Sequence, residues 1–557
     1  MKKLIFLFSI SLMIFSCKPA EETKTLWDLA LEKKDVLKVS TIFTAHDVRD
    51  RLSTESGLDS AIQWCKDAGI TRVFIESFRG YTAERGALLK AKNRFIAAGI
   101  EASGCITPVN FGKTSTGMSI VSCYSDTSTQ NRIREIMEYT ASMFDLIMID
   151  DFLFTDCNCE QCLAAKGGRT LSQYRCDLLT DVGQKYILEP ARKVNPEVKV
   201  IIKFPQWYDD FHRRGYEVLG QTAIYDTIWV GTETRDSDLS RYDRGWEMPQ
   251  YEGYFIMRWL GDIGKSKTGG GWFDALGTTP VNYLEQARQT VLGGAKEFML
   301  FSYGGLIREK NNYGNREGTG IANVDSLKKE LPGLFELAGM IKGKAIKGIL
   351  APKPANSDPY HQSIDEEKFY NYQGDAFVYD YIGMMGLPLV PAERIDAEAE
   401  AAFFSVHALK DPGFKEKLSA MLSGGKPVMI TDFLASKLET IPANNDNLIV
   451  LKLDGNIRNL LKYDRTELNA MRDKMLAPWK IKFDAPAQVS LYLFGDDILI
   501  IENFNNAAVD AKVGMSFSKN ARLKLTLPSA AKVMHQFTGD ALIIQNLPPR
   551  TLAVFTY

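Results

Sequence analysis

The stretch that decides the fold is Asp145–Cys162, which reads DLIMIDDFLFTDCNCEQC. Its apolar run from Leu146 to Ile149 predicts a short buried strand, because the run is far too short to cross a membrane. Two adjacent carboxylates, Asp150 and Asp151, follow this strand directly. In α/β barrels the chemistry lies at the C-terminal ends of the strands. The stretch therefore predicts one barrel strand that delivers acidic side chains to a functional site.

On both sides of this stretch, short apolar runs alternate with amphipathic segments at the spacing of strand–helix units. We expect strands at residues 38–43, 71–75, 101–108, 146–149, 198–204, 227–230 and 297–302, and helices at 58–68, 83–98, 129–144, 171–194 and 283–294. Either Tyr254–Leu260 or Gly271–Leu276 supplies the seventh of eight strands, and the other run is a loop. Eight such units predict a TIM barrel over residues 35–343. A doubly wound sheet is the alternative, which the lack of a glycine-rich phosphate loop after the first strand disfavours.

The C-terminal part of the chain predicts two smaller domains. Residues 344–460 read as a flavodoxin-like α/β domain, with strands at 346–351, 387–390, 402–406 and 427–430 and helices at 375–385 and 413–422. From about Val489 the pattern becomes β alone, in runs such as VSLYLFG and TLAVFTY separated by turn residues. Residues 461–557 therefore predict an antiparallel β-sandwich.

The N-terminus predicts export. Two lysines follow Met1, an apolar core covers residues 4–15, and the run Ile14–Cys17 resembles a bacterial lipoprotein box. We interpret residues 1–17 as a lipoprotein signal peptide, Cys17 as the lipidated residue and residues 18–34 as a tether. A transmembrane anchor would need roughly 20 apolar residues. The expected location is the cell envelope, with the chain lipid-anchored at the periplasmic face or the cell surface.

Composition and motifs exclude several classes of function. The net charge of −2 and the absence of a basic tract argue against a nucleic-acid partner. No signature of a Ser-His-Asp hydrolase appears, and HExxH is absent. We expect no organic cofactor.

The cysteine spacing predicts a metal site. Cys157, Cys159 and Cys162 form C-x-C-x-x-C and offer three thiolates from one loop, whereas a tetrahedral zinc site needs four ligands. Cys123 follows the third predicted strand and would lie beside this loop in a barrel. A disulfide among these thiols is the open alternative, because an exported protein meets an oxidising compartment.

This arrangement is similar to the zinc site of family 42 glycoside hydrolases, the β-galactosidases. The predicted order of barrel, flavodoxin-like domain and β-sandwich also resembles theirs over nearly the whole chain, although the specific motif is confined to Cys123–Cys162. The resemblance implies a glycoside hydrolase in which Cys123, Cys157, Cys159 and Cys162 hold a structural zinc ion. Four thiolates leave no coordination position open for catalysis. The resemblance further implies a homotrimer through the middle domain.

One departure concerns the acids themselves. The family presents an Asn-Glu pair at the end of the fourth strand, where this chain has Asp150 and Asp151. The resemblance places Asp151 at the position of the acid/base and Asp150 beside it. The aspartate side chain is one methylene shorter than the glutamate of the family, so its carboxyl group lies farther from the substrate. This difference implies a changed substrate pose or mechanism, and we therefore do not assign β-galactosidase activity.

Glycoside hydrolysis uses two carboxyl groups that flank the scissile bond. Consecutive strand residues point to opposite faces, so we expect one of Asp150 and Asp151 at the barrel mouth and a partner from across the barrel. Asp274 in TGGGWFDAL is the first candidate, Glu233 is its rival and Glu76 is third. The separation of the two carboxyl groups, about 5 Å for retention and roughly 6.5–9.5 Å for inversion of configuration, would decide the mechanism.

Other side chains near the predicted strand ends suit a carbohydrate substrate, since aromatic rings stack on sugars and polar groups bind their hydroxyls. The predicted substrate-binding residues are Glu76, Lys203, Trp207, Arg258, Trp272 and Tyr303. Two rival functions remain open: a glycan-binding lipoprotein without catalysis, and a divalent-metal enzyme with Asp150 and Asp151 as ligands.

Overall fold

The computed structural model describes residues 24–235, 249–314, 316–359, 375–439 and 445–557. The predicted signal peptide and the lipidation site Cys17 lie outside these residues. Part of the predicted tether is instead a helix, α1 (Leu26–Lys33). A capping box at Thr25 begins it, and its apolar face packs against the barrel core through Leu26 and Trp27.

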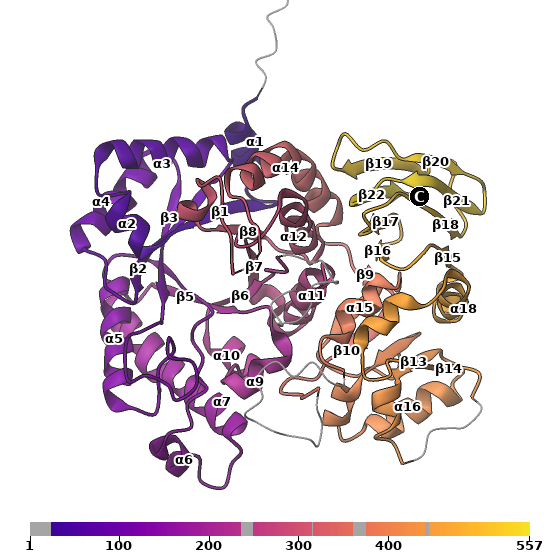
Figure 1. The fold of residues 1–557 in the computed structure, drawn as a ribbon, viewed down its shortest axis with the longest axis horizontal. Coiled ribbons are helices and arrows are strands. Elements are labelled where there is room, and N and C mark those ends of the chain that lie inside the picture. Colours follow the sequence, from indigo (N-terminus) through magenta and orange to yellow (C-terminus); the bar gives the residue numbers. More distant parts are fainter. Residues whose placement is uncertain (1–23, 236–248, 315, 360–374, 440–444) are drawn as a thin grey trace, which may run out of the picture.

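Eight parallel strands form a closed barrel, as the sequence predicted (Figure 1). They are β1 (Lys38–Phe43), β2 (Arg72–Arg79), β3 (Glu101–Thr107), β4 (Leu146–Ile149), β5 (Lys199–Phe204), β6 (Thr227–Gly231), β7 (Thr268–Asp274) and β8 (Glu297–Phe301). Each strand contributes one buried side chain to a layer that fills the barrel: Ile42, Phe74, Cys105, Met148, Ile201, Trp229, Trp272 and Met299. This layer closes the interior, so the barrel is a packed core with a site at one end.

Helices surround the barrel. They are α2 (Ala45–Asp50), α3 (Glu55–Asp67), α4 (Arg85–Ala97), α5 (Thr127–Ala141), α6 (Glu160–Lys166), α7 (Leu171–Val182), α8 (Glu189–Val194), α9 (Phe211–Arg214), α10 (Val218–Ile224), α11 (Glu252–Gly264), α12 (Pro280–Leu292), α13 (Tyr303–Leu306) and α14 (Ile321–Ile341). Of the two candidates for the seventh strand, the one within β7 is confirmed. Tyr254–Leu260 is neither strand nor loop but part of α11. Apolar residues lie on most sides of this helix, and most of them are buried.

The middle domain is a parallel sheet in the order β11-β10-β12-β13-β14. Its strands are β10 (Ile349–Pro352), β11 (Leu389–Ala392), β12 (Ala402–Phe404), β13 (Val428–Thr431) and β14 (Leu448–Leu451), with α15 (Val378–Met384), α16 (Phe414–Ser423), α17 (Asp432–Ala435) and α18 (Arg465–Met475). This second-first-third-fourth-fifth order is that of flavodoxin-like sheets. The predicted fold class is therefore confirmed here as well.

The C-terminal domain pairs two antiparallel sheets, in the orders β15-β18-β21-β20 and β19-β22-β17-β16-β9 (Figure 1, upper right). The strands are β9 (Ile346–Lys347), β15 (Lys482–Asp484), β16 (Val489–Phe494), β17 (Ile498–Asn503), β18 (Val509–Gly514), β19 (Arg522–Leu527), β20 (Met534–Phe537), β21 (Ala541–Leu547) and β22 (Thr551–Thr556). The single strand predicted at 346–351 is in fact two. Gly348, at φ 141°, separates β9, which joins the sandwich, from β10.

Buried polar contacts tie the domains together. The Arg288 guanidinium on α12 forms an ion pair with Glu330 at 2.6 Å and donates to the Arg550 carbonyl of the sandwich at 2.8 Å. Trp259 on α11 donates to the Lys353 carbonyl of the middle domain at 2.7 Å. Among the described residues, no helix combines the length and the hydropathy needed to span a membrane.

Candidate active site

A layer of polar side chains lies directly above the filled interior of the barrel. Strand side chains alternate in direction, so the residue two positions after each core residue again points inward. Two positions after Met148, Ile201 and Trp272 come Asp150, Lys203 and Asp274. Phe74 and Cys105 are likewise followed by Glu76 and Thr107. The strand period therefore places acids and a lysine at the mouth.

These side chains line a pocket of about 330 Å³ at the C-terminal ends of the strands. Its walls are formed by Arg79, Met118, Ile120, Asp150, Asp151, Phe152, Phe154, Lys203, Gln206, Trp207, Glu233, Arg235, Trp272, Asp274, Leu276, Phe301 and Tyr313. A concave site with aromatic walls and a few convergent charged groups is the form expected of a small-molecule pocket.

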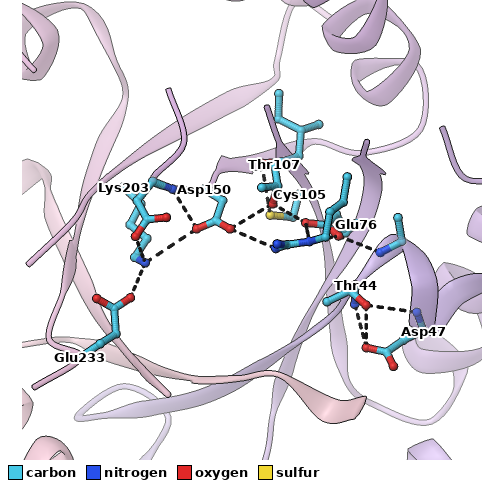
Figure 2. Close-up of polar contacts among 12 residues, drawn as sticks. Thr44, Asp47, Glu76, Cys105, Thr107, Asp150, Lys203 and Glu233 are labelled. Atoms are coloured by element: carbon cyan, nitrogen blue, oxygen red, sulfur yellow. Dashed lines mark hydrogen bonds and ion pairs between the residues drawn. The ribbon is translucent and has the colours of Figure 1, made fainter. Parts of the chain in front are cut away.

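The ammonium of Lys203 is the centre of the pocket. It contacts Asp151 at 2.8 Å, Glu233 at 2.5 Å and Asp150 at 3.7 Å (Figure 2). Lys203 is 1% exposed and lies 4.0 Å from the centre of the Trp272 ring. One cation thus holds carboxylates delivered by strands on either side of its own.

Asp150 anchors a second group of contacts. Its carboxylate accepts hydrogen bonds from Arg79 and from the Thr107 hydroxyl, both at 3.0 Å. Arg79 also pairs with Glu76 at 2.9 Å, and Glu76 accepts from the main-chain N–H of Ala45 at 2.7 Å (Figure 2). Arg79, the Thr107 hydroxyl and, at 3.7 Å, Lys203 therefore surround the Asp150 carboxylate, which suits a positioning role.

Asp274 is held separately by Arg235. The Arg235 guanidinium donates to both carboxylate oxygens, at 2.9 and 3.3 Å, and the N–H of Leu276 donates to one of them at 3.1 Å. A bidentate pair of this kind fixes both partners in place.

Burial and neighbouring charges give the acidic residues of the pocket different pKa values. Burial raises the pKa of Asp151 to about 8, the negative charges of Asp150 and Glu233 add to this, and Lys203 opposes it. Burial also raises the pKa of Glu233, against Lys203 and Arg235. For Asp150 burial acts in the same direction, but Lys203 and Arg79 hold its pKa below the ordinary value. A protonated Asp151 beside an ionised Asp150 is the kind of difference between neighbouring acids that acid–base catalysis uses.

Several predicted site residues come together in this pocket: Asp150, Asp151, Lys203, Trp207, Glu233, Trp272 and Asp274. Asp150 and Asp151 do not point to opposite faces. β4 ends at Ile149, so strand alternation no longer applies at Asp151, and both residues line the pocket.

Three predicted substrate-binding residues do not line it. Glu76 is fully buried behind Arg79 and cannot contact a ligand directly. Arg258 lies on α11, donates to the Leu292 carbonyl at 3.0 Å and faces the opposite end of the barrel, because its segment is a helix. Tyr303 packs on Phe43, with ring centres 4.6 Å apart, since the chain turns into α13 after β8.

Sequence reasoning missed Arg79, Gln206 and Tyr313. A bulge between Glu76 and Phe78 reverses the alternation of β2, so Arg79 points inward where a regular strand would point it out. No signal in the sequence marks that bulge.

The four predicted metal ligands form one cluster at the loops after β3 and β4. The Sγ atom of Cys123 lies 3.5 Å from that of Cys162 and 3.8 Å from that of Cys159, and Cys159 and Cys162 are 3.7 Å apart. With Cys157, all four sulfur atoms lie within 4.8 Å of one another. Tetrahedral zinc with bonds of about 2.3 Å requires sulfur separations of about 3.8 Å, so the residues fit the ion. The described cysteines carry free thiols, with no disulfide among them.

The structure is thus a closed parallel barrel with an acidic pocket, partly walled by aromatic side chains, at the C-terminal ends of its strands. A family model described as "Probable glycosyl hydrolase, catalytic domain" matches residues 24–333, more than half of the chain. The chain belongs to this family, and the predicted enzyme class of glycoside hydrolase is confirmed.

Individual relatives are distant. An uncharacterized protein of Saccharolobus solfataricus is 23% identical over 487 residues, 79% of this chain and 73% of that protein. The alpha-L-fucosidase isoenzyme 2 from Paenibacillus thiaminolyticus has a TM-score of 0.60 at 9% identity, over 93% of this chain and 99% of the other. An exo-carrageenase GH42 from Bacteroides ovatus has a TM-score of 0.45 at 12% identity, over 93% and 79%. At these identities the fucosidase likeness concerns the fold alone, and membership of family 42 stays a prediction.

Proposed function

We propose that this protein is a retaining glycoside hydrolase in which Asp151 is the general acid/base and Glu233 the nucleophile. The observation that carries the proposal is the shared contact of both carboxylates with Lys203, at 2.8 and 2.5 Å. The two bonded oxygens can be no farther apart than the sum of these lengths. That limit lies within the roughly 5–5.5 Å spacing of retaining enzymes and below the spacing that an inverting enzyme needs for its water.

The first chemical step would use both groups at once. The Glu233 carboxylate attacks the anomeric carbon, the glycosidic C–O bond breaks, and the leaving oxygen takes the proton of Asp151. In the second step water attacks the same carbon, gives its proton to Asp151 and releases Glu233. A pKa of about 8 keeps Asp151 protonated at neutral pH, as the first step requires. The Lys203 ammonium favours the ionised form of Glu233.

Glu233 is preferred over Asp274, the first candidate from the sequence. The bidentate pair with Arg235 occupies both oxygens of Asp274. An attack by Asp274 would first have to break these two charge-assisted hydrogen bonds. We assign Asp274 the role of fixing Arg235 at the pocket wall.

The aromatic walls support a carbohydrate substrate. Trp272 stacks on Phe301 with ring centres 5.1 Å apart, and Trp207 packs edge-on against Phe154 at 5.4 Å. The aromatic side chains that line the pocket offer apolar surface to a sugar, and Arg79 and Arg235 offer donors to its hydroxyls.

A glycan-binding protein without catalysis is the second candidate. It is favoured by the position of Lys203, whose ammonium occupies the space between the two proposed catalytic carboxylates. Turnover would require the substrate to reach both carboxylates past this ammonium. The metal-enzyme alternative is disfavoured, because Asp150 and Asp151 already pair with Arg79 and Lys203.

The experiment that separates the candidates is hydrolysis of a panel of aryl glycosides and oligosaccharides by the wild type, Asp151→Asn and Glu233→Gln. Turnover that both substitutions abolish supports the enzyme. Binding of an oligosaccharide without turnover in any of the three proteins supports the binding module.

We further propose that Cys123, Cys157, Cys159 and Cys162 hold a structural zinc ion that would fix the loop after β4 and hence Asp151. The spacing of the sulfur atoms and the nearby Lys113 ammonium, 3.8 Å from the Cys159 sulfur, support an anionic thiolate cluster. Export as a lipoprotein anchored through Cys17, and assembly as a trimer, stay proposals from the sequence. Labelling with a radioactive fatty acid tests the first, and sedimentation of the mature chain tests the second.

A further inference from the structure

The main chain at Asp151 lies just beyond the barrel sheet. β4 pairs with β5 as far as Ile149. The N–H of Asp150 still donates to the Ile106 carbonyl of β3 at 2.9 Å. Asp151 follows one residue later, outside every named strand. A side chain that acts in catalysis needs a fixed backbone, so groups other than the strand ladder must hold this residue.

Two side chains take over this role at the main chain of Asp151. The N–H of Asp151 donates to the Asp150 carboxylate at 2.8 Å. The carbonyl of Asp151 accepts a hydrogen bond from the Tyr216 hydroxyl at 2.6 Å. Both polar groups of this part of the main chain are therefore satisfied, and it is Tyr216 that satisfies the carbonyl.

Tyr216 is itself packed on several sides. Its side chain is fully buried, and the centre of its ring lies 5.5 Å from those of both Trp207 and Phe211. The ring of Phe204 follows at 5.7 Å. Burial raises the pKa of the Tyr216 hydroxyl well above its usual range, so the group stays protonated and can donate. The close packing of the ring fixes the position of this donor.

The segment before Tyr216 contacts the loop after β4 a second time. The Arg214 carbonyl accepts a hydrogen bond from the N–H of Thr155 at 3.0 Å. Gly215, between Arg214 and Tyr216, has φ of 92°, and a Cβ there would lie 2.5 Å from the Leu179 side chain. Only glycine fits this close turn against α7 without a shift of its neighbours. The loop is thus bound at both Asp151 and Thr155 by one short, fixed segment.

We infer that Tyr216 is a positioning residue for the acid/base: its hydroxyl fixes the main chain of Asp151, and with it the place from which the carboxyl group protonates the leaving oxygen. Tyr216 is not among the described residues that line the pocket, so it acts through Asp151 and not on the substrate. The inference rests on the proposed function in taking Asp151 as the general acid. A displaced acid matters most where the leaving group needs its proton, so the effect of losing the hydroxyl should depend on the leaving group.

Tyr216→Phe tests the inference, because it removes one hydroxyl and keeps the ring. The matched control is Tyr225→Phe, at a tyrosine that is also fully buried but whose hydroxyl meets no hydrogen-bond partner among the described residues. Values of kcat/KM are measured on two glycosides of the sugar that the wild type turns over fastest, one with dinitrophenol as a good leaving group and one with methoxyphenol as a poor one. We expect Tyr216→Phe to lower kcat/KM roughly 5- to 50-fold with the poor leaving group and less than about threefold with the good one. Tyr225→Phe should change both values by less than about twofold.

A double-mutant cycle with Asp151→Asn separates positioning from general damage to the fold. Once the acid is gone there is nothing left to position, so adding Tyr216→Phe to Asp151→Asn should change kcat/KM on the poor leaving group by less than about twofold. A purely structural role would instead slow Asp151→Asn as much as the wild type. All rates are read below the melting temperature of every variant, so a less stable Tyr216→Phe is judged by the same cycle.

The inference is overturned if Tyr216→Phe slows both glycosides equally or slows neither, if Tyr225→Phe behaves like it, or if its effect persists in Asp151→Asn. Each of these results leaves the hydrolase standing, because turnover by the wild type and its loss in Asp151→Asn are measured in the same experiment. Should the wild type turn over no glycoside, the proposed function fails instead. Hydrogen exchange of the peptide that spans residues 150–156 then decides whether Tyr216 holds Asp151. Faster exchange in Tyr216→Phe than in Tyr225→Phe supports the contact, and equal exchange overturns it.

Discussion

The carboxylates of Asp151 and Glu233 hydrogen-bond to the same donor, the ammonium of Lys203. Asp151 follows β4, Lys203 lies on β5 and Glu233 follows β6, so three neighbouring strand ends build the contact. The barrel thus brings residues that are far apart in the sequence into one cluster of charged side chains. The chemistry proposed for the site depends on this convergence.

Replacing either carboxylate should greatly reduce turnover. Loss of the general acid in Asp151→Asn should lower kcat/KM by about 10²- to 10⁴-fold on substrates with poor leaving groups. Glu233→Gly should be inactive, and added azide should restore activity by attacking the anomeric carbon in place of the carboxylate. NMR of the glycosyl azide would show the configuration opposite to that of the substrate.

Asp274→Asn is the matched control for these two variants. It removes a charge from the same pocket, yet we expect it to keep measurable turnover and to respond to no azide. If azide instead rescued Asp274→Gly and left Glu233→Gly inactive, the nucleophile would be Asp274.

The pH dependence of kcat/KM should be bell-shaped with an alkaline limb near pH 8. Asp151 acts as an acid only while protonated, so activity falls as the pH rises through its pKa of about 8. Glu233 acts only while ionised, and its raised pKa puts the acidic limb above the ordinary glutamate value of about 4.3. Initial rates from pH 4 to 10 measure both limbs. A plateau that continued to pH 10 would contradict a protonated Asp151.

Lys203→Met should move this profile toward alkaline pH. The ammonium lowers the pKa values of both Asp151 and Glu233, so its removal raises both. The variant should also be less active and less stable, because three carboxylates in a buried site lose their common cation. Lys203→Arg keeps the charge and should keep the limbs near their original positions. A profile that does not move in Lys203→Met would mean that this charge does not set the acid–base behaviour.

Strand periodicity accounts for part of this site. Once β4, β5 and β7 are placed, alternation alone directs Asp150, Lys203 and Asp274 inward, two residues beyond the core layer. The choice between Asp274 and Glu233 could not be made in the same way, because it depends on the Arg235 contact. Arg235 has φ of 50°, a backbone conformation that no pattern in the sequence announces.

The errors have physical causes of the same kind. The apolar run Tyr254–Leu260 fits a buried strand and a buried helix equally well, and its place in the longer helix α11 decides the matter. The position of Tyr303 directly after β8 predicts a ring at the barrel mouth, but the chain turns there and buries the ring against Phe43. The local hydrophobic pattern predicts most of the strands and helices. The direction that the chain takes after each strand depends on tertiary packing, which the local pattern does not contain.

The cysteine cluster offers the last prediction. If Cys123, Cys157, Cys159 and Cys162 hold zinc, the purified protein should contain about one equivalent by elemental analysis, and Cys157→Ser should lose most of it. Because the same loop follows β4 and carries Asp151 into the pocket, this variant should also melt at a lower temperature, by roughly 5 °C or more, and turn over more slowly. Cys65→Ser is the matched control, since Cys65 is a fully buried thiol on α3 outside the cluster. It should keep its zinc even where its own packing costs some stability. Zinc well below half an equivalent in the wild type, with Cys157→Ser melting and turning over as the wild type does, would remove the metal and its role in holding Asp151.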